Sequence, residues 1–63
     1  MTEFEKVLMR RDDMTAEEAA TCRKNARDEI YKMFDDDFSD FEVEDYLLDQ
    51  YGLEMDYIFD ILL

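Results

Sequence analysis

The residues best suited to chemistry lie in the run DDDFSDFEVEDY, which begins at Asp35 and contains no Lys or Arg. Such a run can bind calcium, form a solvated tail, begin a helix or imitate nucleic acid. An EF-hand loop needs oxygen ligands at positions 1, 3 and 5, Gly at 6 and Glu at 12. A loop beginning at Asp35 places Asp40 at position 6 and Tyr46 at position 12, and the later registers put Phe38 or Phe41 on a ligand position. We therefore expect no dedicated metal site, although the three leading aspartates would attract divalent cations loosely.

Catalysis by paired carboxylates requires burial that separates their pKa values, and nineteen Asp and Glu guarantee close pairs by chance. The chain has no His, and its one cysteine, Cys22, falls on the predicted inner face of a helix. One Cys without His also argues against a zinc site. A chain of 63 residues has little bulk to enclose a pocket. We therefore expect a protein that is not an enzyme and uses no cofactor.

The charge is divided unevenly along the chain. Residues 1–32 hold all seven Lys and Arg and eight of the nineteen acids, whereas residues 33–63 hold eleven acids and no base. Nearly the whole net charge of −12 therefore lies in the C-terminal half. A mixture of both signs would keep a helix soluble with less repulsion, so solubility alone does not explain this absence of bases. A strongly negative field opposes nucleic-acid phosphates and anionic membranes, and favours a basic partner.

The elements that position these carboxylates are predicted to be helices. The chain has no Pro and a single Gly, which is poor material for a β fold with many turns. Three capping-box signatures occur: Thr2 with Glu5, Thr15 with Glu18, and Ser39 with Glu42. Apolar spacing then predicts helices over residues 3–11, 16–34, 40–51 and 55–62. We expect one all-α domain over residues 1–63, a compact bundle of three to four short helices with the longer second helix at its centre.

Apolar residues at helical spacing predict the inner faces of these helices. They are Phe4, Val7 and Leu8; Ala19, Cys22, Ala26, Ile30 and Met33; Val43, Tyr46, Leu47 and Tyr51; and Ile58, Ile61 and Leu62. In the second helix small residues precede large ones, so a neighbour should approach closely near Ala19 and lie further away near Ile30. Its opposite face, with Arg23, Lys24, Arg27 and Lys32, is predicted to be solvated and to include an Asp28–Lys32 ion pair. Gly52 is predicted to end the third helix in the left-handed conformation.

The third helix carries the candidate site. Glu42, Asp45 and Asp49 share one face, and Asp40 and Glu44 form a second row. Neighbours on such rows are about 5–6 Å apart, a spacing similar to that of DNA phosphates. The predicted partner-binding residues are Asp40, Glu42, Glu44, Asp45, Asp49, Asp56 and Asp60, the last two joining the array if the final helix packs alongside the third. Five aromatics exceed what one small core can hold, so one or two should be exposed as contact anchors: Phe41, Tyr46, Tyr51, Tyr57 and Phe59.

Two segments of the chain resemble parts of small acidic helical proteins encoded by phages and mobile elements. One is the C-terminal run Gly52-Leu53-Glu54, Asp56-Tyr57-Ile58 and Ile61-Leu62-Leu63; the other is the helix opening Thr15-Ala16-Glu17-Glu18-Ala19. That wider class includes inhibitors of restriction and CRISPR nucleases, some of which act as nucleic-acid mimics. The resemblance implies a similar inhibitory function for this chain.

The favoured hypothesis is a non-catalytic acidic module that occupies a basic surface of a nucleic-acid-binding protein such as a nuclease, as an inhibitor or a nucleic-acid mimic. The alternative is a structural homodimer that buries the aromatic C-terminal helices. The local Lys and Arg cluster is interpreted as a solvated helix face, with no direct nucleic-acid binding. An acidic N-terminus without a long apolar run is not typical of a signal peptide, and no segment is long enough to span a membrane. A lone Cys favours a reducing cytoplasmic setting.

Overall fold

Helices α1 (Glu3–Arg11), α2 (Ala16–Asp35) and α3 (Asp40–Tyr51) are followed by a 3₁₀ helix, η1 (Met55–Tyr57), and a short last helix, α4 (Ile58–Leu62). The computed structural model describes residues 1–62, so Leu63, the end of the C-terminal run noted above, lies outside the described residues. The all-α prediction is confirmed, and no strand occurs in residues 1–62. Only two boundaries differ: α2 extends one residue further, and the first turn of the last helix is 3₁₀.

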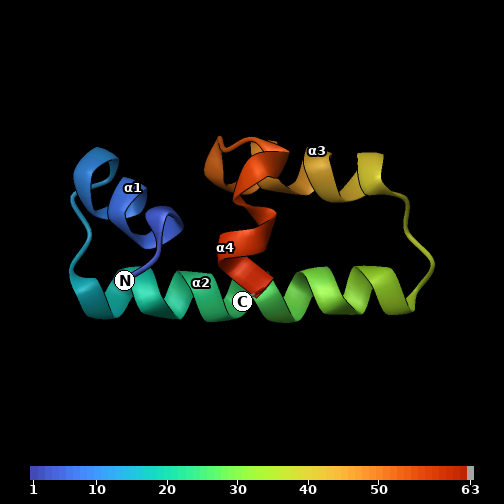
Figure 1. Ribbon diagram of the computed structural model, residues 1–63, viewed down its shortest axis with the longest axis horizontal. Helices are drawn as coiled ribbons and strands as arrows, with labels where there is room; N and C mark the ends of the chain where they lie inside the picture. Colours follow the sequence, from blue (N-terminus) through green and yellow to red (C-terminus); the bar gives the residue numbers. More distant parts are fainter. Residues whose placement is uncertain (63) are drawn as a thin grey trace.

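The long helix α2 forms the base of the molecule, and the other helices lie on one side of it (Figure 1). Helix α1 covers its N-terminal half, α3 runs back along its C-terminal half, and α4 stands between them and reaches down to α2. The longest dimension is 33 Å, close to the roughly 30 Å expected for the twenty residues of α2. One long helix therefore determines the length of the whole fold.

The distance between α2 and its neighbours increases along its length. Near its start, α1 makes the most extensive close backbone approach in the described fold, and Ala19 and Ala26 are fully buried. Helix α3 makes few such approaches to α2, and the larger side chains of Ile30 and Met33 fill the space instead. The predicted taper from small to large residues is therefore confirmed.

The core joins all four helices in one cluster. Its buried residues are Phe4, Leu8, Ala19, Ala26, Ile30, Met33, Val43, Leu47, Leu53, Ile58 and Ile61. The remaining predicted inner residues are half-buried at its edge: Val7, Cys22, Tyr46, Tyr51 and Leu62. Cys22 packs there with its Sγ 3.9 Å from the Sδ of Met14, as expected of a small core residue.

Two of the three predicted capping boxes are complete. The Thr2 hydroxyl accepts from the Glu5 N–H while the Glu5 carboxylate accepts from the Thr2 N–H, and Thr15 and Glu18 do the same. At α3, the Ser39 hydroxyl accepts from the Glu42 N–H at 3.4 Å, but the reciprocal hydrogen bond from the Ser39 N–H to the Glu42 carboxylate is not formed. The predicted Ser39–Glu42 box is thus only half present, and the Glu42 carboxylate is left available for other contacts.

The helix C-termini use left-handed residues. Gly52 has φ +65° and ends α3 as predicted, with its N–H donating to Leu48 at 2.9 Å and Leu53 buried beyond it. The same conformation occurs at Asp13 (φ 55°) and Asp37 (φ 62°), where Gly is the usual residue. The aspartate run is therefore a helix terminator.

The prediction for the basic face of α2 is wrong in two respects. Arg23 is half-buried, and its Nε donates to the backbone carbonyl of Asp60 at 2.9 Å. The Asp28–Lys32 ion pair does not form; both residues are exposed, where such pairs stabilise little. Arg23 therefore connects α2 to α4 and is more than a solvated surface residue.

Candidate functional site

The outer surface of α3 is set by what the helix buries. Val43 and Leu47 are fully buried, so the helical period turns residues about half a turn away toward solvent. Glu42, Asp45 and Asp49 occupy that outer side, and all three are exposed. We call these three residues the acidic face.

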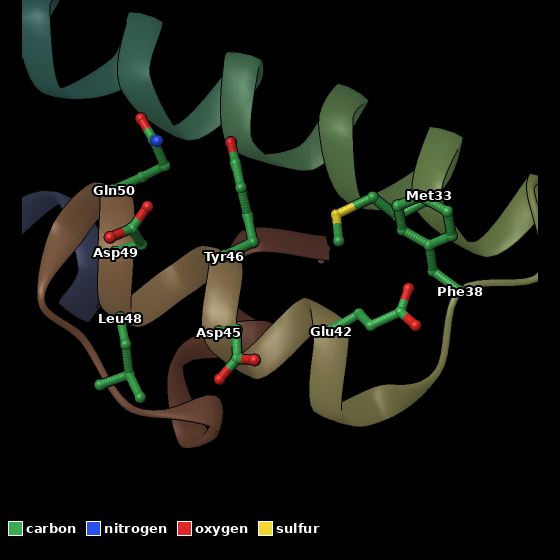
Figure 2. Close-up of a pocket in the computed structure, with 8 residues that line it drawn as sticks. All are labelled: Met33, Phe38, Glu42, Asp45, Tyr46, Leu48, Asp49 and Gln50. Atoms are coloured by element: carbon green, nitrogen blue, oxygen red, sulfur yellow. The ribbon is translucent and has the colours of Figure 1, made fainter.

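All three residues of the acidic face line one open groove of about 610 Å³. The other lining residues are Met33, Phe38, Tyr46, Leu48 and Gln50, and we call this site the α3 groove. Figure 2 shows Tyr46 and Gln50 pointing from α3 toward α2, Met33 and Phe38 side by side at one end, and the carboxylates on the α3 side. The predicted sharing of one face is therefore confirmed, and that face includes apolar groups.

Phe38 reaches this groove because of the way α2 ends. The Asp37 N–H donates to the Phe34 carbonyl at 3.1 Å, and the Phe38 N–H donates to the Met33 carbonyl at 2.9 Å. This is the Schellman arrangement, in which the residue after the left-handed position packs back on the last turn. It places the Phe38 ring beside Met33, although the ring remains 45% exposed.

Among the described residues, no Lys or Arg pairs with the acidic face. The groove has no Lys or Arg in its lining, and its three carboxylates form no ion pair or side-chain hydrogen bond within residues 1–62. The two described ion pairs, Lys6 with Glu3 and Arg11 with Asp12, both lie at α1. Within residues 1–62 the site is therefore a negative surface without a paired cation, which attracts cationic groups over about a Debye length.

Two tyrosines hold α3 in position behind the acidic face. The Tyr51 ring packs edge-on against Phe4 with centroids 5.3 Å apart, and against Tyr46 at 6.1 Å. Burial raises the pKa of Tyr46 far above its ordinary value, and burial also raises the pKa of Tyr51. Their hydroxyls therefore stay protonated, and the rings connect α3 to α1 as part of the core.

The other four predicted site residues lie elsewhere. Asp40 and Glu44 are exposed on α3 but do not line the α3 groove. Asp56 and Asp60 line a separate open groove of about 340 Å³, together with Glu3, Glu54 and Tyr57. The array was expected to extend to α4 only if α4 packed alongside α3. Instead α4 crosses toward α2, so this extension is not formed (Figure 1).

Two exposed apolar residues lie on the outer side of α3, one expected and one not. Phe41 is 79% exposed and Leu48 is 48% exposed. They are seven residues apart, so they lie nearly in line along the helix, and we call them the apolar row. The signal was readable in the sequence, because both positions fall opposite Val43 and Leu47. The expectation that one or two aromatics are exposed is confirmed at Phe41 and Phe59, the latter 71% exposed on α4.

Among the described residues, no other group forms a site as well defined as the α3 groove. No group of three or more His, Cys, Asp or Glu among residues 1–62 is arranged to hold a metal ion. Within the same residues, no helix is long and apolar enough to cross a membrane. Comparisons with protein-family models, curated proteins and solved structures find no match.

Proposed function

We propose that this protein is a non-catalytic acidic module that occupies a basic surface on a nucleic-acid-binding protein in a reducing, cytoplasmic compartment. The observation that carries the proposal is the acidic face: Glu42, Asp45 and Asp49 are exposed, side by side on a fixed helix, and without a cation. Packed helices and tyrosine rings hold the α3 backbone that carries these carboxylates, so only their side chains must be ordered on binding, which lowers the entropic cost.

A protein surface that binds nucleic acid suits this arrangement. Such surfaces present Lys and Arg at phosphate spacing, and carboxylates about 5–6 Å apart on a helix meet them on the same scale. Binding of this kind blocks the nucleic-acid site by competition. Inhibition of a nuclease or another nucleic-acid-binding enzyme is the role that follows.

Paired affinity capture tests the proposal. The immobilised wild-type chain is compared with the double variant Glu44→Lys and Asp45→Lys, which reverses charge on both α3 rows. The matched control is Glu17→Lys with Asp28→Lys, two exposed acids on α2. Glu18 is avoided because it completes a capping box. After nuclease treatment, wild type and control should retain the same proteins, released by salt, and the α3 variant should lose them. Equal retention by all three would contradict the proposal.

The alternative function is self-association, favoured by the exposed Phe59 on α4 and Phe41 on α3. A two-fold interface brings the same surface of each copy together. On α3 that would oppose two acidic faces, whereas around Phe59 it would oppose the smaller number of acids on that segment, Asp56 and Asp60, so the α4 surface is the better interface. Sedimentation of wild type and Phe59→Gln separates the two functions. A wild-type dimer that dissociates in this variant supports the homodimer.

A further inference from the structure

We infer that the surface of α3 is built to bind a basic amphipathic helix, whose apolar stripe packs on Phe41 and Leu48 and whose Lys or Arg residues pair with the acids on either side. This inference rests on the proposed function and specifies its partner. It joins two features that the acidic-module proposal leaves separate: uncompensated carboxylates and exposed apolar side chains on one helix.

The apolar row is a surface for contact because nothing in the described fold covers it. Val43 and Leu47 already provide the inner face of α3, and both are fully buried. Phe41 and Leu48 lie on the opposite side, with the 79% exposed Phe41 ring the more open of the two. Phe38, in the turn before α3, packs beside Met33 at the end of the α3 groove and is not part of this row. Phe41 and Leu48 lie at i and i+7 of one helix, a spacing found among the apolar contacts of helix recognition.

Acids flank the apolar row on both sides. At about 100° per residue, Asp40 and Glu44 fall on one side of the line from Phe41 to Leu48, and Asp45 and Asp49 fall on the other. The order around the helix is therefore acid, apolar, acid. A basic amphipathic helix presents the complementary order, with an apolar stripe between two rows of Lys or Arg. Charge complementarity on both flanks also sets the register of the two helices.

Two other occupants fit this surface less well. A second copy of the chain would place acidic flanks against acidic flanks, and like charges a few ångströms apart repel. A partner with a flat basic surface suited only to phosphates would pair with the carboxylates but would leave Phe41 and Leu48 in water. The apolar row therefore favours a partner that has its own apolar stripe.

Three synthetic peptides of about 15 residues, enough to lie along the roughly 18 Å of α3, provide the test. One carries Leu at helical spacing between Lys rows, the second has the same composition in scrambled order, and the third replaces each Leu by Ala. Fluorescence anisotropy with the full chain in about 0.15 M and about 1 M salt reports affinity. We expect the amphipathic peptide to bind about tenfold or more tightly than either control, and to keep part of its affinity in high salt.

The chain offers a matched set of variants. Phe41→Gln with Leu48→Gln removes the apolar row, and Phe59→Gln removes a similarly exposed ring outside it. Gln is a good helix former, and far-UV circular dichroism checks that each variant keeps its helices. The apolar-row variant should lose about tenfold in affinity for the amphipathic peptide, and Phe59→Gln should bind like wild type.

The outcomes separate this inference from the proposed function. One outcome overturns the amphipathic partner and leaves the acidic module standing. In it, all three peptides bind equally, Phe41→Gln with Leu48→Gln has no effect, and Glu44→Lys with Asp45→Lys abolishes binding. Self-association that the apolar-row variant abolishes identifies a second copy as the occupant and overturns the inference. Failure of every peptide to bind overturns the inference as well. The affinity capture described above tests the proposed function independently.

Discussion

The Nε of Arg23 donates a hydrogen bond of 2.9 Å to the backbone carbonyl of Asp60, 37 residues further along the chain. That carbonyl lies in the last turn of α4, where helix carbonyls lack an intrahelical partner. A basic residue from the N-terminal half thereby holds the final helix of the C-terminal half, which has no Lys or Arg. This contact and the core residues Ile58 and Ile61 attach α4 to α2.

Loss of this contact should loosen α4. We expect Arg23→Ala to lower the free energy of unfolding by about 1–2 kcal/mol, because the half-buried side chain loses both its hydrogen bond and its packing. Urea denaturation measures the change, and hydrogen exchange in residues 58–62 should accelerate more than in α1. The control is Lys24→Ala, which removes the same charge from an exposed neighbour; an equal effect there would show that net charge, and not this contact, is responsible.

One substitution at the C-terminal end of α2 should stabilise the fold. Asp37 adopts φ 62°, a conformation that costs residues with a Cβ more than it costs Gly. We expect Asp37→Gly to raise the free energy of unfolding by about 0.5–1 kcal/mol. Asp36, at φ −88°, provides the matched control. Asp36→Gly removes the same charge without relieving strain, so stabilisation by both variants alike would assign the effect to charge.

Acidification should weaken the two complete capping boxes. Hydrogen bonds from the Thr2 backbone and hydroxyl lower the pKa of Glu5, and those from Thr15 lower the pKa of Glu18. Their contribution to stability is therefore fully present above the ordinary value of 4.5 and is lost as pH falls through the lower folded values. Glu5→Gln with Glu18→Gln keeps an acceptor but removes the titration, so its stability should fall less steeply below about pH 4.5 than that of wild type.

The control for this comparison is Glu17→Gln, since the Glu17 carboxylate accepts no hydrogen bond from the cap. Thermal unfolding at a series of pH values gives the slopes. A double variant that follows the wild-type slope would mean that the caps do not depend on charge.

The charge reversal on α3 should stabilise the free protein. Glu44→Lys places a base four residues after Asp40, and Asp45→Lys places one three residues after Glu42. Pairs at these spacings contribute about 0.2–0.5 kcal/mol each, and they replace mutual repulsion. Wild-type stability should increase with salt as this repulsion is screened, and the double variant should depend less on salt. Urea denaturation in low and high salt measures both, and a less stable double variant would contradict the reading of α3 as a surface kept acidic for binding.

Local interactions could be predicted from the sequence, and long-range ones could not. The caps at Thr2 and Thr15 and the left-handed Gly52 depend on residues within one turn, and they form as predicted. The separation of Asp56 and Asp60 from the acidic face depends on how α4 crosses the bundle, which no local spacing encodes. Arg23 did leave a signal, since it lies at i+4 from Ala19 and i−3 from Ala26, on the inner side of α2.

The candidate site divides in the same way. Helical spacing was enough to group Glu42, Asp45 and Asp49, because all three belong to one helix. The half-formed cap at Ser39 was not predictable, since its sequence spacing is the same as that of the two complete boxes. The groove itself arises from the distance between α2 and α3, which the sizes of Ile30 and Met33 set and only the packed structure reveals.

The most direct test of the central claim is displacement of nucleic acid from the partner. A protein recovered by the acidic-face capture is bound to a fluorescently labelled oligonucleotide, and anisotropy is followed as the chain is added. We predict that wild type and the Glu17→Lys with Asp28→Lys control release the oligonucleotide at near-stoichiometric amounts, and that Glu44→Lys with Asp45→Lys does not. Release by none of the three, or equally by all of them, would contradict the claim that α3 occupies a nucleic-acid-binding surface.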